Sequence, residues 1–432
     1  MSIEPWGRFP KIPQKGLHPS WPEEVRKYGL EYQYKGYLPF GNGRSYGDVC
    51  LAESQNVIVS RGLDRFMAFD REEGIVRVQA GITLGEILEV VVQDGWFLPV
   101  IPGTRFATVG GAIANDVHGK NHHVKGTFGR YIRRLWLVRD GEQLECSPTS
   151  NSDLFRATIG GLGLTGFITE AEISLMPVSN GDIDVTTHRF NCLRDFFTLA
   201  DEYDRTHEYG VAWIDCLSHG DETGRGVYFA GNHACYRSTN SFSGSSVTFP
   251  FTPPISLVNR VSLRAFNQFY WNAKPTQPKQ ERVPYLNYFF PLDGIQNWNR
   301  MYGVKGFQQY QCVIPLSDAH DVMSEILKTI SDAKSGSFLA VLKRCGDMQS
   351  PGLLSFPMEG VSLALDFPNT EKTVPLFDQL DEIVESARGR IYPAKDAHMS
   401  SSFFRASYPD WSLLESLRDK SICSHFWRRV LA

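Results

Sequence analysis

A glycine-rich stretch between residues 102 and 126, PGTRFATVGGAIANDVHGKNHHVKG, constrains this chain more than any other. It contains five glycines, three histidines and two lysines. Glycine tolerates positive φ and has no Cβ, so turns at 102–104 and 110–112 let backbone N–H groups approach an anion. The polar residues that follow are too dense for an ordinary surface loop. The stretch therefore predicts a cofactor cradle with reactive side chains beside it.

A second glycine loop lies in LPFGNGRSYGDVC, residues 38–50. Its exposed amides and the Arg44 guanidinium are typical of a phosphate-binding loop. The loop departs from GxGxxG, because one residue too many precedes Gly47. It is also not a Walker loop, since no Gly-Lys-Ser/Thr follows. These departures disfavour a Rossmann nucleotide site.

Composition excludes several function classes. A length of 432 residues predicts two or three domains with a large core. A net charge of −4 without a basic run argues against nucleic-acid binding. No apolar run reaches the ~18 residues of a membrane span, and the N-terminus lacks the apolar core of a signal peptide. Eight scattered cysteines without a CxxC are interpreted as reduced thiols, and no zinc-like ligand spacing is found. We expect a cytoplasmic protein, or a peripheral one on the inner membrane face.

Residue periodicity divides the chain near residue 178. Before it, short alternating strands surround a helix over 83–94, with Thr83 and Glu86 forming a capping box. A hairpin is expected across Asp140-Gly141. After it, we expect an aromatic helix over 264–274, an aromatic strand or wall over 285–293, and a mobile loop over 239–254. The phenylalanines of that loop would cover an apolar ligand or touch a membrane surface, the alternative being an ordinary surface loop.

Three later strands are expected to place polar side chains on one face, because side chains alternate along a strand. In 307–315, Gln309 and Gln311 share a face. In 338–343, Lys343 shares a face with residues 339 and 341. In 361–367, Ser362 and Ala364 share a face with Asp366.

Several segments resemble the decaprenylphosphoryl-β-D-ribose 2′-oxidase family of vanillyl-alcohol-oxidase-like flavoproteins. They are GNGRSYGD, PGTRFATVGGAIANDVHGKNHHVKGTFG, GGLGLTGFI, FFPLDGIQNWNRMYGVKGFQQYQCVIP and GRIYPAKD. The HGKNHH block is highly specific within that superfamily. The resemblance runs over nearly the whole chain and implies an α+β fold. It implies a PCMH-type FAD-binding domain over 1–178, completed by 390–432, and an α+β substrate domain on an antiparallel sheet over 179–389.

The resemblance also implies which residues contact FAD. They come from both glycine loops, the polar stretch, one strand and the C-terminal return. A histidine in the first glycine loop attaches FAD covalently in several flavoproteins of this class, but Tyr46 stands in that loop here, so we expect non-covalent FAD. The expected contacts are Gly41, Asn42, Gly43, Arg44, Ser45, Tyr46, Gly47, Gly103, Thr108, Val109, Gly110, Gly111, Asn115, Asp116, Val117, His118, Ile168 and Tyr392.

Catalytic roles implied by the resemblance fall on Lys395, His118 and Tyr46. Lys395 would stabilise negative charge on reduced flavin. The alternative for Lys395 is a surface pair with Asp396. His118 would hold flavin or substrate or act as a base, and otherwise is a bystander bonded to backbone. Tyr46 would close the pocket or relay a proton, with core packing equally open.

Substrate contacts are implied for six residues. Lys120 would meet the lipid phosphate or the sugar hydroxyls, with a structural role as the alternative, and Lys343 would meet the substrate phosphate. Gln309 and Gln311 would meet the sugar hydroxyls, a polar strand face being the alternative. Mycobacterial members carry Asn and Cys where Ser362 and Ala364 stand, so covalent inhibitors that trap that thiol should form no adduct here. The expected contacts are Lys120, Gln309, Gln311, Lys343, Ser362 and Ala364.

The resemblance implies FAD-dependent oxidation of the 2-hydroxyl of a polyprenylphosphoryl-β-D-ribose to the 2-keto sugar. Electrons would pass to a quinone-like acceptor or oxygen, and a short-chain reductase partner would complete epimerisation to the arabinose donor for cell-envelope glycans. Two alternatives stay open: the same chemistry on a soluble sugar or aldonolactone, and a flavin-binding scaffold without turnover.

Overall fold

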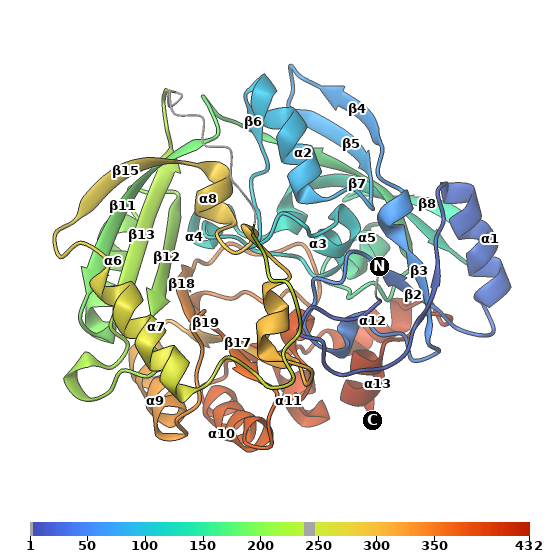
Figure 1. Ribbon diagram of the computed structural model, residues 1–432. Helices are drawn as coiled ribbons and strands as arrows, with labels where there is room; N and C mark the ends of the chain where they lie inside the picture. Colours follow the sequence, from blue (N-terminus) through green and yellow to red (C-terminus); the bar gives the residue numbers. More distant parts are fainter. Residues whose placement is uncertain (1–2, 237–246) are drawn as a thin grey trace.

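Eight antiparallel strands form the largest sheet of the computed structural model, which describes residues 3–236 and 247–432 (Figure 1). The spatial order is β15-β11-β13-β12-β18-β19-β17-β20. Every neighbouring pair is antiparallel, as the family resemblance implies. The strands are β11 (Asp182–Phe190), β12 (Tyr209–Ile214), β13 (Gly226–His233), β15 (Lys279–Pro284), β17 (Phe307–Pro315), β18 (Val341–Cys345), β19 (Gly360–Pro368) and β20 (Arg390–Ile391).

One face of this sheet is covered by α6 (Leu193–Tyr203), α9 (Ala319–Asp332) and α10 (Thr373–Ser386). Tyr310 and Cys312 of β17 are buried in the core on that side. Because side chains alternate along a strand, Gln309 and Gln311 then point to the opposite face. The predicted polar face of 307–315 is therefore confirmed.

Two smaller sheets belong to the N-terminal part. A five-stranded antiparallel sheet has the order β4-β5-β9-β7-β8, and a three-stranded parallel sheet the order β1-β3-β2. The predicted hairpin is confirmed: Asp140 and Gly141 both have positive φ, 51° and 75°, as a two-residue turn requires. The strands are β1 (Lys15–Leu17), β2 (Leu38–Phe40), β3 (Asn56–Val59), β4 (Phe66–Asp70), β5 (Ile75–Gln79), β7 (Ile132–Arg139), β8 (Glu142–Cys146) and β9 (Phe167–Ser174).

The predicted capping box opens α2 (Leu84–Val91). Thr83 Oγ1 accepts from the Glu86 N–H at 3.2 Å, and Glu86 Oε2 accepts from the Thr83 N–H at 2.7 Å. These bonds satisfy N–H groups that a helix start leaves free. The other helices of this part are α1 (Pro22–Tyr32), α3 (Val109–Ala114), α4 (His122–Lys125) and α5 (Ser152–Thr158).

The C-terminal helices α11 (Ser401–Ser407), α12 (Trp411–Leu417) and α13 (His425–Leu431) return to the N-terminal part (Figure 1). Single β-bridges join Tyr37 to Ile422 and Ala52 to Ser424. The helix α13 packs on the short 3₁₀ turn η1 (Asp48–Cys50) directly after the first glycine loop. The chain end therefore braces the segment that lines the site.

Some predicted bounds are wrong. Residues 285–293 were expected as an aromatic strand or wall. They form no strand, because Pro284 has no N–H to continue the ladder of β15, and the helical turn α8 (Tyr285–Phe289) follows. The alternative of a wall is confirmed, since Tyr288, Phe289 and Leu292 line a cavity. The aromatic helix is α7 (Arg260–Asn272), and β18 begins at Val341, so residue 339 precedes it. The remaining strands are β6 (Trp96–Phe97), β10 (Met176–Pro177), β14 (Val247–Thr248) and β16 (Ile295–Gln296).

The predicted loop over 239–254 falls partly outside the described residues, which resume at 247. Within the described ranges, none of the helices has both the length and the apolar composition needed to cross a membrane. All eight cysteines lie in the described part and are free thiols, which agrees with the absence of a CxxC spacing.

Candidate active site

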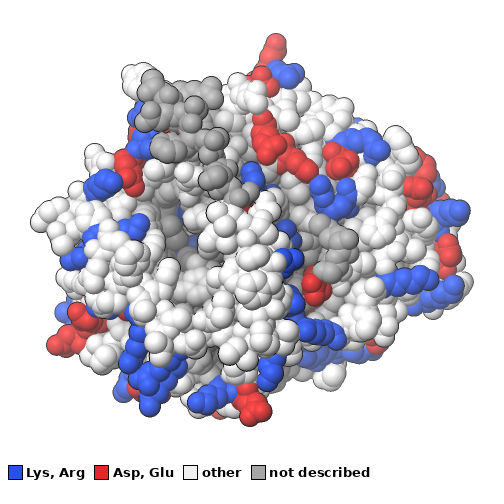
Figure 2. All heavy atoms as spheres, in the orientation of Figure 1, with Lys and Arg blue, Asp and Glu red and all other residues white. Residues whose placement is uncertain are grey.

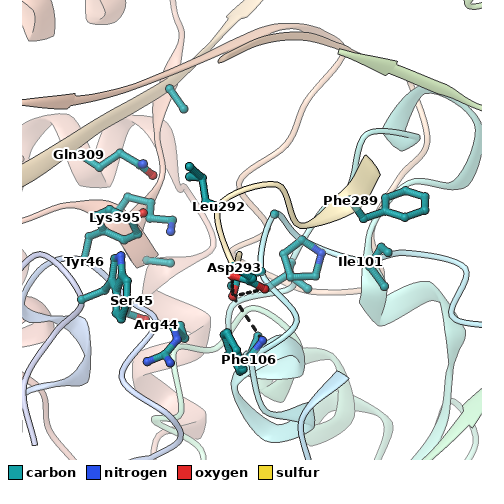
Figure 3. Close-up of a pocket in the computed structure, with 18 of the residues that line it drawn as sticks. Arg44, Ser45, Tyr46, Ile101, Phe106, Phe289, Leu292, Asp293, Gln309 and Lys395 are labelled. Carbon is teal, nitrogen blue, oxygen red and sulfur yellow. Dashed lines mark hydrogen bonds between the residues drawn. The ribbon is translucent and has the colours of Figure 1, made fainter. Parts of the chain in front are cut away.

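A cavity of about 1030 Å³ lies between the open face of the eight-stranded sheet and the two glycine loops. It is as large as the largest ordinary ligand pockets, which run to ~1,000 Å³. Figure 3 shows Arg44, Ser45 and Tyr46 from the first loop on one side, near Lys395 and Gln309. The segment with Leu292 and Asp293 closes the opposite side. The sequence-predicted loops and polar strands thus meet in one place.

The two glycine loops pack against each other at Gly41 and Thr108. A Cβ on Gly41 would lie 2.5 Å from Thr108 Oγ1, so only glycine allows this approach. Asn42 Nδ2 donates to the Phe106 carbonyl at 2.9 Å. Thr108 Oγ1 also accepts from the Gly111 N–H at 3.2 Å and caps α3. The backbone of both loops is therefore fixed before any ligand binds.

Two buried amide oxygens in the lining, Asn42 Oδ1 and Asn115 Oδ1, have no hydrogen-bond partner in the protein. Asn115 Nδ2 donates to the Gly111 carbonyl at 2.8 Å, and Asn42 Nδ2 is likewise bound to a carbonyl. Since carbonyls only accept, neither amide can be turned round. Each oxygen needs a donor from a ligand, because unpaired buried acceptors cost free energy. FAD carries suitable N–H and O–H donors, so the residues present fit this cofactor.

Lys395 is half-buried at the end of the 3₁₀ turn η7 (Pro393–Lys395) and lines the cavity. Its Nζ lies 3.7 Å from the ring centroid of Tyr46. Burial lowers the pKa of this ammonium, and the Asp366 carboxylate opposes the shift. Burial raises the pKa of Tyr46 well above its usual value, so its phenol stays protonated. The alternative of a surface Lys395–Asp396 pair is wrong, because Asp396 pairs elsewhere.

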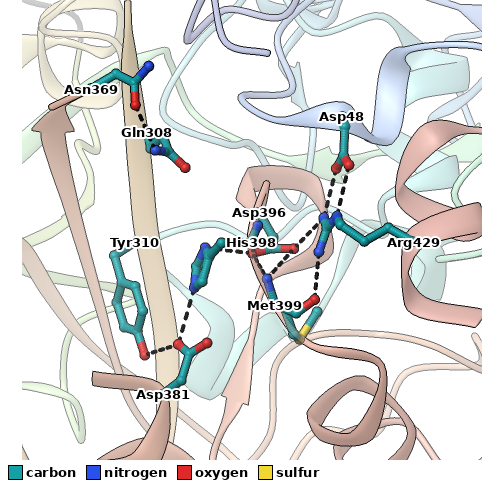
Figure 4. A network of polar contacts seen from close by, with 9 residues as sticks. All are labelled: Asp48, Gln308, Tyr310, Asn369, Asp381, Asp396, His398, Met399 and Arg429. Atoms are coloured by element: carbon teal, nitrogen blue, oxygen red, sulfur yellow. Dashed lines mark hydrogen bonds and ion pairs between the residues drawn. The ribbon is translucent and has the colours of Figure 1, made fainter. Parts of the chain in front are cut away.

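Asp396 belongs to a buried charged network behind Lys395 (Figure 4). Its carboxylate lies 2.8 Å from Arg429 Nη2 and 2.9 Å from His398 Nδ1. The same guanidinium reaches Asp48 of η1 at 2.9 Å. Burial alone would disfavour a charged Asp396, but Arg429 and His398 outweigh it and hold the pKa of this carboxyl well below its usual range. The network ties η7, η1 and α13 together next to Lys395.

Protonation of His398 should make the stability of the folded protein depend on pH. Burial opposes its charge, but Asp396 and Asp381 raise the imidazole pKa to about 10. The pKa of His398 is higher in the folded protein than in the unfolded chain, where it is ~6.5. The charged imidazole therefore stabilises the fold fully below pH ~6.5, and this stabilisation is lost as the pH rises through about 10. We expect the thermal midpoint of His398→Gln to lie furthest below wild type under pH 6.5 and to converge by pH 10. His320→Gln, at a half-exposed surface position, should leave the thermal midpoint close to wild type; a pH-independent gap for His398→Gln would contradict the charged imidazole.

His118 is held from both ring nitrogens. Lys343 Nζ contacts Nδ1 and also donates to the Gly119 carbonyl at 2.8 Å. The Gln311 amide lies 3.3 Å from Nε2. Burial and the nearby lysine lower the pKa of His118 well below its usual value, so the ring is neutral. An ammonium cannot accept, so Nδ1 accepts and the ring proton is assigned to Nε2. This assignment requires the Gln311 amide to be oriented with its oxygen, which can accept, toward Nε2.

Lysines gather in this cavity. Lys120 Nζ contacts the Tyr288 carbonyl and lies 4.3 Å from the centroid of that ring. Burial lowers the pKa of Lys120 to about 7 and that of Lys343 to about 8. The strand register places Lys343 opposite Ser362 and Gln311 opposite Ala364. A cavity with several partly desolvated lysines suits an anionic group that keeps them charged.

Most predicted site residues line the cavity, and three do not. Gly47 instead lets the chain approach Asp396, whose carbonyl oxygen would lie 1.7 Å from an added Cβ. Val109 is a core residue. Asp116 is fully buried and accepts from the Gly129 N–H at 2.8 Å and the Ser350 hydroxyl at 2.5 Å. These three support the loops from behind.

Two features escaped the sequence analysis. Asp366 lines the cavity, although the alternation of 361–367 had only placed it on that face. Asp293 joins its segment to the second loop, accepting from the Thr104 hydroxyl at 2.9 Å and the Arg105 N–H at 2.8 Å (Figure 3). Asp293 and Arg105 are 188 residues apart in the sequence, so no local sequence pattern indicates this contact.

Comparison with known proteins agrees with this geometry. Residues 25–147 match a family model described as FAD binding domain. Decaprenylphosphoryl-beta-D-ribose oxidase of Mycolicibacterium smegmatis is 33% identical over 426 residues, 94% of this chain and 90% of that protein. Human Delta(24)-sterol reductase is 34% identical over 28% of this chain and 24% of its own. A putative D-arabinono-1,4-lactone oxidase of Neurospora crassa is 30% identical over 40% of this chain and 31% of its own.

The fold, the cavity and the matched domain define an FAD-dependent oxidoreductase with a PCMH-type FAD-binding domain. Identity above 30% across nearly the full length places the chain more narrowly: it belongs to the decaprenylphosphoryl-β-D-ribose oxidase family.

Proposed function

We propose that this chain oxidises the 2-hydroxyl of a polyprenylphosphoryl-β-D-ribose to the 2-keto sugar. The proposal rests on the 33% identity to the mycobacterial oxidase, which extends over 94% of this chain. The cavity supports it, because Gln309, Gln311 and the lysines form a polar end while Trp213, Phe266 and other apolar residues form the rest. Such a cavity suits a phosphorylated sugar with an attached hydrocarbon chain.

Each polar residue has a distinct part in this proposal. FAD, when bound, supplies the hydride acceptor. Lys395 holds positive charge where negative charge develops on oxidation of the substrate. Gln309 and Gln311 orient the sugar hydroxyls, and Lys120 and Lys343 bind the phosphate. His118, protonated on Nε2, donates a hydrogen bond rather than accepting a proton.

The proposed division into domains is an FAD-binding unit, residues 1–178 with 390–432, and a substrate unit, 179–389. The contacts of α13 with η1 and the bridges at Tyr37 and Ala52 support assigning the chain end to the first unit. The pairing of β20 with β17 crosses that boundary at residues 390–391. The cofactor would then sit on the first unit, facing the sheet of the second.

An exposed apolar surface beside the cavity supports a lipid substrate. Ile255, Val261 and Phe269 are 74%, 77% and 73% exposed, and Phe266 of the same helix lines the cavity. Figure 2 shows mostly uncharged side chains across the front of this face, with Lys and Arg along its lower edge. We propose that this surface touches a membrane that holds the prenyl chain, and that a short-chain reductase then reduces the keto sugar.

The substrate is tested by anaerobic reduction of the purified holoenzyme. Prenylphosphoryl-β-D-ribose should bleach the flavin absorbance. The same ribose phosphate without lipid should be at least ~100-fold poorer in kcat/KM, because burying about four methylenes at ~0.8 kcal/mol each already supplies ~3 kcal/mol. Aldonolactones and free sugars serve as controls. Equal reduction by a soluble sugar would favour the soluble-substrate alternative, and no reduction by any of these compounds would favour a scaffold without turnover.

A further inference from the structure

Asp366 is a carboxylate that the proposed function leaves without a role. It is 1% exposed, lies on β19 and lines the cavity. Gln309, its direct partner on β17, donates from Nε2 to Oδ1 at 2.6 Å. The Asp366 N–H donates to the Ser337 hydroxyl at 3.1 Å, which fixes the backbone there. The carboxylate is therefore held on the sheet face that meets the ligand.

Three titratable groups face Asp366 from the elements packed against it: Lys395 from η7, Tyr46 from the first glycine loop, and Tyr302 from η6 (Trp298–Tyr302). Lys395 is the cation among them. Burial raises the pKa of the Asp366 carboxyl to about 7, with Gln309 and Lys395 opposing the shift. A carboxylate poised near neutral pH suits general base catalysis.

Oxidation of an alcohol requires a proton acceptor, and the other polar groups nearby are unsuited to that task. Tyr46 stays protonated because burial raises its pKa. Nδ1 of His118 is occupied by Lys343, and its Nε2 carries the ring proton. Lys395 is needed as a cation. Asp293 and Glu281 also line the cavity, but Asp293 accepts from the Thr104 hydroxyl and the Arg105 N–H, and Glu281 pairs with Lys279. Among the described carboxylates of the lining, Asp366 is left as the acceptor at the polar end.

We propose that Asp366 is the general base that takes the proton of the reacting sugar hydroxyl. This inference rests on the proposed function. The O–H bond breaks as its proton passes to Asp366, the C–H bond of the carbinol carbon breaks with loss of a hydride, and the C=O bond forms. FAD, when bound, would accept that hydride and with it the two electrons that the substrate loses.

The electrostatic interaction between Lys395 and Asp366 gives this step an advantage. Before reaction, the Asp366 carboxylate is the negative charge that opposes the lowering of the Lys395 pKa by burial. After reaction, Asp366 is neutral and the negative charge resides on the electron acceptor. Lys395 therefore keeps one opposite charge throughout, and no net charge is created in a low-dielectric cavity.

Infrared titration of the FAD-loaded protein tests the carboxyl group without turnover. A protonated-carboxyl C=O band should disappear with a midpoint near pH 7 in wild type. Asp366→Asn should lack that band, and Glu281→Gln, which changes a cavity-lining carboxylate at the exposed edge strand, should keep it. A band that persists unchanged in Asp366→Asn would overturn the assignment.

Stopped-flow reduction by prenylphosphoryl-β-D-ribose tests the role. The base must be ionised, so the wild-type rate should rise with pH through the same midpoint. Asp366→Asn should be about 10²–10⁴-fold slower and lack this rise, while Glu281→Gln keeps it. An Asp366→Asn rate within threefold of wild type, with the same pH rise, would overturn the proposal.

Asp366→Glu covers the case in which Asp366→Asn fails to retain FAD. It keeps a carboxylate in a shifted position, so the pH rise should persist with a displaced midpoint and a lower rate; an unaltered profile would count against the proposal. If wild type is not reduced by any prenylphosphoryl ribose, the proposed function fails, and the infrared titration still decides whether Asp366 ionises near neutral pH.

Discussion

Lys395→Ala should slow flavin reduction by substrate about 100- to 1000-fold while leaving FAD bound. A preorganised donor aimed at developing negative charge is typically worth ~2.7–4 kcal/mol of transition-state stabilisation. Lys395 is half-buried, and its ammonium lies over the Tyr46 ring within the cavity. A water molecule in the space left by the Lys395 side chain would not restore the positive charge. The rate of anaerobic flavin bleaching at saturating substrate measures the effect directly.

A second lysine provides the control. Lys274 also lines the cavity, but it lies beyond the end of α7 and contacts the rings of Phe229 and Tyr270. Lys274→Ala should therefore reduce flavin at close to the wild-type rate. If Lys395→Ala and Lys274→Ala behave alike, the ammonium of Lys395 does not stabilise the transition state.

Arg429→Ala is expected to destabilise the fold by ~3–5 kcal/mol, because breaking a buried ion pair leaves an uncompensated charge. Arg429 bonds to Asp48 at 2.9 Å and Asp396 at 2.8 Å, and both carboxylates are buried. The thermal unfolding of the holoenzyme should shift to a lower midpoint. Flavin should also be released at a lower temperature, because η1 and η7 border the cavity.

The neighbouring residue makes a matched comparison. Arg428 pairs with Glu53 at 2.7 Å, but its side chain is 66% exposed. Exposed pairs contribute ~0–1 kcal/mol, so Arg428→Ala should leave the unfolding midpoint nearly unchanged. Equal losses for the two variants would show that the buried network has no special part in holding the site.

The sequence alone predicted the structural features that depend on short, local residue spacings. The Thr83 capping box, the Asp140-Gly141 turn and the shared face of Gln309 and Gln311 follow from short spacings, and all are confirmed. The site residues could be grouped because glycine loops and a family resemblance mark them. Whether each performs its predicted role stays a prediction.

Long-range contacts could not be predicted. Asp48 and Arg429 are 381 residues apart, and neither lies in a pattern that points to the other. The Asp396 carboxylate looked like a surface partner for Lys395 because adjacent opposite charges usually pair at the surface. Its burial depends on how α13 returns to η1, which no local spacing encodes. For the same reason, the pKa of Asp366 became visible only once Lys395 and Gln309 were placed around it.

The visible spectrum of the purified protein, before and after acid precipitation, tests the central claim that the glycine loops hold FAD and present it to a sugar carbon. The account predicts a yellow protein with a flavin spectrum and a yellow supernatant containing intact FAD, because Tyr46 stands where a linking histidine would be. A colourless protein that cannot be reconstituted with FAD would contradict it.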